Sequence, residues 1–116
     1  MEEKKFKFII DERDIPIMKF EGEIVFENSN QLKEAAKNKL RETEYKNLIM
    51  DMKDVTFIDS SGIGFILSLL KFLREREGNL VIANVNDKIR KSFEITKISQ
   101  IIEVFTSVDK AYNHLK

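Results

Sequence analysis

The sequence has 116 residues and contains no Cys, no Trp, one His, one Pro and four Gly. Without cysteine the chain has no disulfide, no thiolate metal site and no thiol nucleophile. The single histidine, His114, cannot supply a metal site built from several histidines. Lys plus Arg and Asp plus Glu both number 20, so the formal net charge is zero. This balance argues against direct nucleic-acid binding, which normally requires a basic surface.

Long apolar runs are also absent. The most apolar region, residues 57–73, contains Asp59, Lys71 and three serines, so it is too polar and too short to span a bilayer. Residues 1–5 lack the apolar stretch of a signal peptide. A hydrophobic share of 42% is sufficient for one core, and a chain of this length usually forms one domain. We expect a single domain over residues 1–116, in the cytoplasm and not inserted in a membrane.

The apolar residues that are present recur in patterns typical of strands. Residues 6–10 and 18–24 alternate between apolar and polar, and a polar turn at residues 11–14 joins them. This arrangement predicts an antiparallel pair at the edge of a sheet. Nearly continuous apolar runs at residues 48–52 and 80–83 predict strands that are buried on both faces. Residues 101–105 predict a last short strand.

Helical spacing of apolar residues separates these strands. It predicts helices that open at Asn28, at Asn86 and at Thr106 or Ser107, and a further helix over residues 63–73 with Gly78 just past its end. The resulting order is β-β-α-β-α-β-α-β-α. We therefore predict an α/β fold with a mostly parallel sheet of four to five strands, an antiparallel N-terminal edge strand and about four helices.

The helix over residues 63–73 has a wide apolar arc. We expect neighbouring elements to cover Phe65 and Phe72, although an exposed phenylalanine here could anchor a partner. Lys71, Arg74 and Arg76 alternate with glutamates and are interpreted as a solvated face.

The segment Phe57-Ile-Asp-Ser-Ser-Gly-Ile-Gly64 follows a predicted buried strand, at the edge where α/β folds usually bind their ligands. Asp59, Ser60 and Ser61 favour a helix N-terminus, where backbone N–H groups attract negative charge. A phosphate on a hydroxyl there would be stabilised by these groups. Gly62 and Gly64 are poor helix formers. They predict close approach of a partner's backbone or of the helix's own sheet.

The residues alone leave two interpretations of this segment: a helix cap with a packing device, or a regulated site. Catalysis is not expected, because His114 lies in the last predicted helix and the Gly-x-Ser-x-Gly elbow is absent. Asp51 and Asp54 could suggest a phospho-acceptor aspartate, but they are interpreted as strand-end and turn residues. Gly62-Ile-Gly64 lacks the rest of a phosphate-binding loop. We expect no cofactor and no metal.

Residues 57–64 resemble the signature of the STAS domain, in particular that of the bacterial anti-sigma factor antagonists. The resemblance covers almost the whole chain. It includes Gly22-Glu23-Ile24, the buried strand at residues 48–51 and the Gly-containing approach at residues 78–83. One departure is Val25, which stands where many relatives carry an Asp linked to partner contact. We expect the partner, or its affinity, to differ here.

The resemblance implies a phosphorylation switch. By position, Ser60 would be phosphorylated by a partner that is both an anti-sigma factor and a serine kinase, with Ser61 as its neighbour. The unphosphorylated form would bind that partner and release the sigma factor, and a phosphatase would reset the phosphorylated form. The implied partner-binding residues are Asp59, Ser60, Ser61, Gly62, Ile63 and Gly64. The alternatives are a scaffold or regulatory subunit of a lipid-transport or signalling assembly, and a sensor of a nucleotide or lipid.

Overall fold

The hairpin predicted near the amino end is present in the computed structural model, which describes residues 6–116. Strand β1 (Phe6–Ile10) pairs antiparallel with β2 (Pro16–Ile24). The remaining elements are α1 (Phe26–Arg41), β3 (Leu48–Ile58), α2 (Ser60–Glu75), β4 (Leu80–Ala83), α3 (Asp87–Ile95), a 3-10 turn (Ile98–Gln100), β5 (Val104–Phe105) and α4 (Val108–Leu115).

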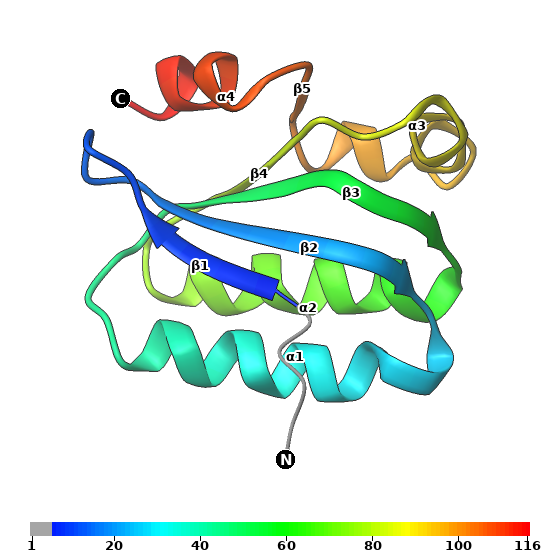
Figure 1. Ribbon diagram of the computed structural model, residues 1–116, viewed down its shortest axis with the longest axis horizontal. Coiled ribbons are helices and arrows are strands. Elements are labelled where there is room, and N and C mark those ends of the chain that lie inside the picture. Colours follow the sequence, from blue (N-terminus) through cyan, green and yellow to red (C-terminus); the bar gives the residue numbers. More distant parts are fainter. Residues whose placement is uncertain (1–5) are drawn as a thin grey trace.

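These strands form one sheet in the order β1-β2-β3-β4-β5 (Figure 1). All pairs after the hairpin are parallel. The predicted α/β fold with an antiparallel N-terminal edge strand is therefore confirmed, with five strands.

Helices α1 and α2 cover one face of the sheet, and α4 lies on the other (Figure 1). The alternation along β2 explains this division, because Met18 and Phe20 enter the core beneath α1 and α2, whereas Ile17 joins a smaller cluster with Ala111 of α4. Phe65 of α2 packs edge-on against Phe20, with ring centroids 5.5 Å apart. The expectation that neighbours cover Phe65 is thus confirmed.

Helix α1 begins at Phe26, two residues before the predicted cap Asn28. Asn28 instead lies in the first turn of α1, and its side chain forms hydrogen bonds with the backbone that precedes the helix. Its Oδ1 accepts a hydrogen bond from the Val25 N–H at 2.9 Å, and its Nδ2 donates to the Glu23 carbonyl at 2.7 Å. The helix thus starts where β2 ends, with almost no connecting loop.

Strand β3 is longer than its apolar run predicted, and this changes the position of two acids. Asp51 and Asp54 lie inside β3, not at its end and in a turn, because pairing with β2 continues to Ile58. Asp51 is buried, and its Oδ1 accepts hydrogen bonds from the Lys53 N–H and the Asn84 Nδ2 at 3.0 and 3.1 Å. The last strand, in contrast, was predicted over residues 101–105 and comprises only Val104–Phe105.

Gly78 lies just past the carboxyl end of α2, as predicted, and its N–H donates a hydrogen bond to the Leu73 carbonyl at 2.8 Å. The residue with the left-handed backbone is Glu77, with φ of 64°, and not Gly78. Gly78 is required for space, because a Cβ there would collide with the Lys46 carbonyl.

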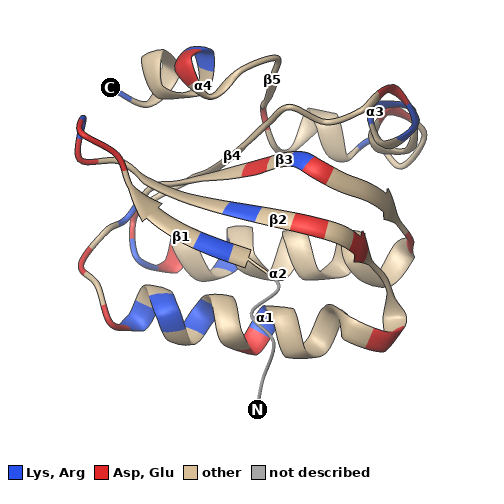
Figure 2. Cartoon of the chain, viewed as in Figure 1, with Lys and Arg blue, Asp and Glu red and all other residues tan. Residues whose placement is uncertain are grey.

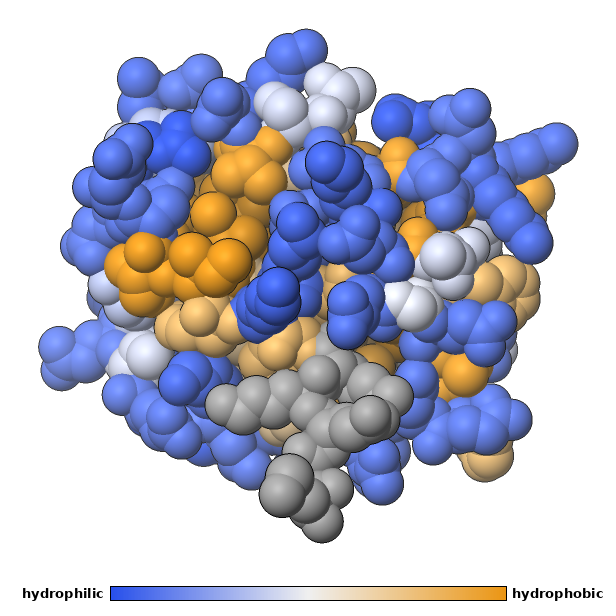
Figure 3. Space-filling view, viewed as in Figure 1, coloured by the Kyte–Doolittle hydropathy of each residue, from blue (hydrophilic) through white to orange (hydrophobic). Residues whose placement is uncertain are grey.

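The surface is mixed in character. Exposed apolar atoms show over the end of β1, where Ile9 and Ile10 lie (Figure 3). Charged residues are spread over β1, β2 and β3 and over α1, but no residue of α2 before Lys71 is charged (Figure 2). Within residues 6–116, every helix is too short or too polar to cross a membrane.

Candidate functional site

The segment at residues 57–64 lies where the carboxyl ends of β2 and β3 meet, at the right-hand edge of the sheet (Figure 1). Since these strands are parallel, the turn from β2 into α1 and the turn from β3 into α2 lie side by side. The Asp59 N–H donates a hydrogen bond to the Ile24 carbonyl at 3.3 Å. Two helix starts are therefore brought together at one edge.

Asp59 is the cap residue of α2. Its Oδ1 accepts a hydrogen bond from the Gly62 N–H at 3.0 Å, and its Oδ2 accepts one from the Phe26 N–H at 3.0 Å. These hydrogen bonds stabilise the ionised carboxylate and hold the pKa of Asp59 below its ordinary value, the bond from Gly62 having the larger effect. Because Asp59 supplies the cap, the serines that follow it are not needed for capping.

Ser60 is the first residue of α2 and is exposed, whereas Ser61 is half-buried. An exposed hydroxyl in the first turn lies at the positive end of the helix dipole, where backbone N–H groups have no partner within the helix. The site can therefore accept a negatively charged group on Ser60 without rearrangement of the helix.

The two glycines of the segment have different surroundings. A Cβ on Gly62 would collide with the Ile24 carbonyl and with the Ile58 side chain, so this glycine lets α2 pack closely against its own sheet. Gly64 is exposed, and a Cβ there would meet nothing within 4 Å. The sequence predicted that these glycines allow close approach either of a partner or of the helix's own sheet. Close packing against the sheet applies to Gly62 alone. Ile63, between them, is half-buried and packs on the core.

One neighbour of this segment was missed by sequence reasoning. Phe26, at the start of α1, is 75% exposed. Val25, which precedes it, is half-buried and forms the cap position of α1. The sequence pattern placed the helix start at Asn28 and so gave no signal for Phe26, which is brought here by the parallel pairing of β2 and β3.

The opposite end of α2 is held by Arg76, which is not the solvated residue that the charge pattern predicted. Its guanidinium donates to the Leu40 and Thr43 carbonyls at 2.9 and 2.6 Å, at the carboxyl end of α1. It also lies over the half-buried Phe72 ring, 5.5 Å from the centroid. The carbonyls at the end of a helix lack partners within that helix. Arg76 is therefore half-buried against the end of α1 and not fully solvated.

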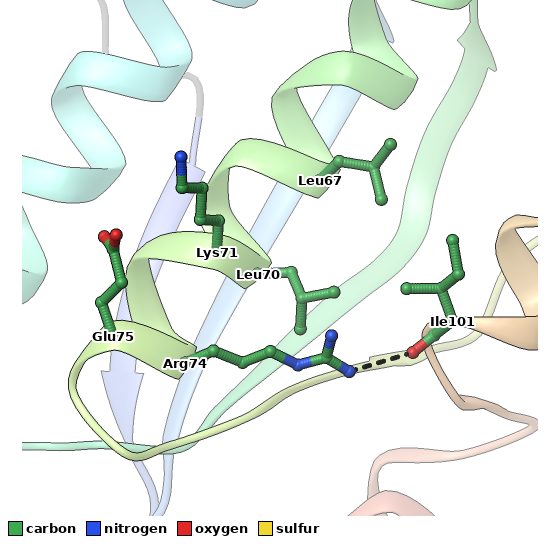
Figure 4. A pocket seen from close by; sticks show the side chains of 6 residues that line it. All are labelled: Leu67, Leu70, Lys71, Arg74, Glu75 and Ile101. Carbon is green, nitrogen blue, oxygen red and sulfur yellow. Dashed lines mark hydrogen bonds between the residues drawn. The ribbon is translucent and has the colours of Figure 1, made fainter.

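A groove lies between α2 and the chain near Ile101, on the half of α2 that is remote from Ser60. Leu67 and Leu70 point toward Ile101 across it, and Arg74 donates a hydrogen bond to the Ile101 carbonyl at 3.3 Å (Figure 4). Lys71 and Glu75 complete its lining. The groove is separate from the predicted site residues.

Comparison with known proteins places this geometry in a family. The model of the STAS domain matches residues 9–111. The anti-sigma-B factor antagonist of Listeria monocytogenes is 39% identical over 57 residues, which are 49% of this chain and 50% of the relative. The match thus spans half the length of that relative.

Solved structures extend the likeness to the complete fold. The crystal structure of a candidate anti-sigma factor antagonist from Thermotoga maritima has a TM-score of 0.87 at 22% identity, and covers 95% of this chain and 93% of its own. The anti-sigma factor antagonist SpoIIAA in its unphosphorylated form has a TM-score of 0.77 at 18% identity, with 94% of each chain covered. At these identities the structures show a shared fold. Together with the match over residues 9–111, they show that the chain belongs to the STAS domain family.

Proposed function

We propose that this protein is an anti-sigma factor antagonist that is switched off by phosphorylation of Ser60. In its unphosphorylated form it binds an anti-sigma factor that is also a serine kinase, and the sigma factor is released. A phosphatase restores the active form. The cycle takes place in the cytoplasm, and the protein itself performs no catalysis and contacts no nucleic acid.

The observation that carries this proposal is the division of roles between Asp59 and Ser60. Asp59 accepts the capping hydrogen bond of α2 from the Gly62 N–H and a second bond from the Phe26 N–H of α1, and Ser60 stays exposed beside it. Because the Asp59 carboxylate accepts the capping bond from the Gly62 N–H, the start of α2 does not need the Ser60 hydroxyl as its cap. Here a kinase can modify Ser60 while the helix start remains intact.

The same geometry separates the two effects of a phosphate. In the free protein, an anion in the first turn of α2 is favoured by the helix dipole, by about 0.3–1 kcal/mol for an exposed charge. In a close-packed interface, the phosphate adds about −1.5 to −2 charges that would lose their hydration. Phosphorylation is therefore expected to weaken binding and to leave the fold unchanged.

Phosphorylation by the anti-sigma factor kinases encoded in the source genome tests the proposal directly. The protein is incubated with each purified kinase and ATP, and the modified peptide is identified by mass spectrometry. We expect phosphate on Ser60, normal labelling of the Ser61→Ala variant and no labelling of Ser60→Ala. Phosphate on Ser61 alone, or normal labelling of Ser60→Ala, would contradict the assignment.

A further inference from the structure

The side chain of Phe26 is the most exposed large apolar group within residues 6–116, at 75% exposure. Leaving most of a phenylalanine side chain in water forfeits the free energy that its burial would contribute. The hydrogen bond that joins Phe26 to the start of α2 comes from its backbone N–H, and the side chain is left largely exposed. An aromatic side chain in such a position is typical of a residue that becomes buried in a complex.

The position of Phe26 relative to Ser60 is fixed by three contacts. The Phe26 N–H donates to Asp59 Oδ2 at 3.0 Å. The Asp59 N–H donates to the Ile24 carbonyl at 3.3 Å, and the absence of a Cβ on Gly62 lets that same carbonyl approach α2. Ser60 directly follows Asp59, and Phe26 lies two residues after Ile24. Phe26 and Ser60, both exposed, therefore lie on two helix starts that are held together.

The part of α2 that adjoins this surface favours close, apolar contact. Gly64 lies one helical turn after Ser60, is exposed and has open space where a Cβ would be. No residue of α2 before Lys71 is charged (Figure 2). A partner backbone can therefore approach Gly64 closely without having to neutralise a charge on this helix.

We propose that Phe26 is the apolar anchor of the interface with the anti-sigma factor, and that its ring enters an apolar pocket of that partner beside Ser60. This inference rests on the function proposed above and specifies the chemistry of the partner: an apolar pocket opposite Phe26 and a closely fitting surface opposite Gly64. Val25, which precedes Phe26, is half-buried and uncharged. Phe26 is a binding and specificity residue.

An apolar contact of this kind accounts for the sensitivity of the interface to phosphate. Residues that surround an anchor exclude water from it. A phosphate on Ser60 would then be enclosed at the edge of a dry contact, where an ion without a partner is strongly disfavoured. The ring and the glycine thus create the environment in which one phosphate is sufficient to prevent binding.

Affinity measurements with a matched control test this inference. Phe26→Ala and Ile95→Ala both remove an exposed apolar side chain, since Ile95 is 73% exposed at the carboxyl end of α3. Binding to the purified anti-sigma factors of the source genome is measured by calorimetry, for the parent, both variants, Phe26→Leu and Ser60→Asp. Thermal unfolding of each protein shows whether its fold is retained.

We expect Phe26→Ala to weaken binding at least tenfold, Phe26→Leu to restore most of the affinity, and Ile95→Ala to change it less than twofold. All variants should melt near the parent temperature. The anchor role is overturned if Phe26→Ala binds like the parent while Ser60→Asp still weakens binding, or if Ile95→Ala causes an equal loss. If the parent binds none of these anti-sigma factors, the proposed function fails and the anchor role fails with it.

Discussion

Asp59 and Phe26 are joined by a hydrogen bond of 3.0 Å from the Phe26 N–H to the Asp59 carboxylate, across 33 positions of the chain. The other oxygen of the same carboxylate accepts the Gly62 N–H at 3.0 Å. One acid therefore satisfies a backbone donor at the start of two different helices. Such donors have no partner within their own helix, so both helix starts depend on this side chain.

Replacing Asp59 by Asn tests this dependence through pH. The lowered pKa of Asp59 means that its ionised form stabilises the folded state. That contribution is complete above the ordinary value of 3.8 and is lost as the pH falls through the lower folded-state value. Asn keeps an oxygen for Gly62 but presents a donor to the Phe26 N–H. We expect the parent to melt at a higher temperature than Asp59→Asn at neutral pH.

The difference between the two melting temperatures should shrink as the pH is lowered below 3.8, because protonated Asp59 resembles the amide. Thermal unfolding of both proteins, followed by circular dichroism over a pH series, measures it. A difference that stays constant into strong acid would show that the charge of Asp59 contributes nothing.

The two glycines of α2 provide a matched pair. Gly62→Ala forces a Cβ against the Ile24 carbonyl and the Ile58 side chain, and overpacking of this kind costs about 1–3 kcal/mol. Gly64→Ala places its Cβ in open space and should stabilise the helix by up to about 1 kcal/mol. Urea unfolding of both variants measures these free energies. Equal effects at the two positions would contradict the difference in packing.

Ser60→Asp tests whether charge acts on binding and not on folding. The variant should keep the parent's circular dichroism spectrum and roughly its melting temperature. Its affinity for the anti-sigma factor should fall at least tenfold, or about 1.4 kcal/mol. Asp carries less charge than phosphoserine, so the authentic phosphoprotein should bind more weakly still. Tight binding of phosphorylated protein would contradict the switch, and unfolding of Ser60→Asp would show that Ser60 is structural.

The end of α2 makes a further test. Glu77 has a left-handed backbone at φ of 64°, which costs a residue with a Cβ about 1 kcal/mol. Glu77→Gly should therefore stabilise the protein by about that amount. Gly78→Ala should destabilise it, since its Cβ would collide with the Lys46 carbonyl. Urea unfolding of both variants distinguishes this arrangement from one in which the residue at position 78 is the left-handed one.

Much of the fold could be predicted because local pattern and tertiary burial agree. The alternation along β2 places Met18 and Phe20 in the main core, and the apolar runs of β3 and β4 become central strands. The caps at Asn86 and Ser107 accept the hydrogen bonds from Ile89 and Lys110 that their residue types predict. Each of these features depends on residues a few positions apart.

The features that were missed depend on contacts between distant segments. Gly78 resembles a helix-end glycine in sequence, and only the approach of Lys46 shows why it is needed. Arg76 resembles a surface cation until the end of α1 supplies two carbonyls for it. For the candidate site, the cap pattern predicted where Ser60 would lie. Phe26 lies beside Ser60 because β2 and β3 are parallel neighbours, so that the helices that follow them start at the same edge of the sheet.

The hydrogen bonds between α1 and α2 determine whether a modification of Ser60 can change binding at the far end of α2. Asp59 joins their starts, Arg76 joins their far ends, and Lys37 donates to Ser68 between them at 2.9 Å. Three hydrogen bonds between the helices oppose sliding of one along the other, and a phosphate acts at a distance only through a second state that it favours. A protein that occupied only the groove beside Ile101 would therefore bind the phosphorylated and unphosphorylated forms with equal affinity. We expect such a protein to remain bound while the proposed anti-sigma factor binds to and dissociates from the other end of α2.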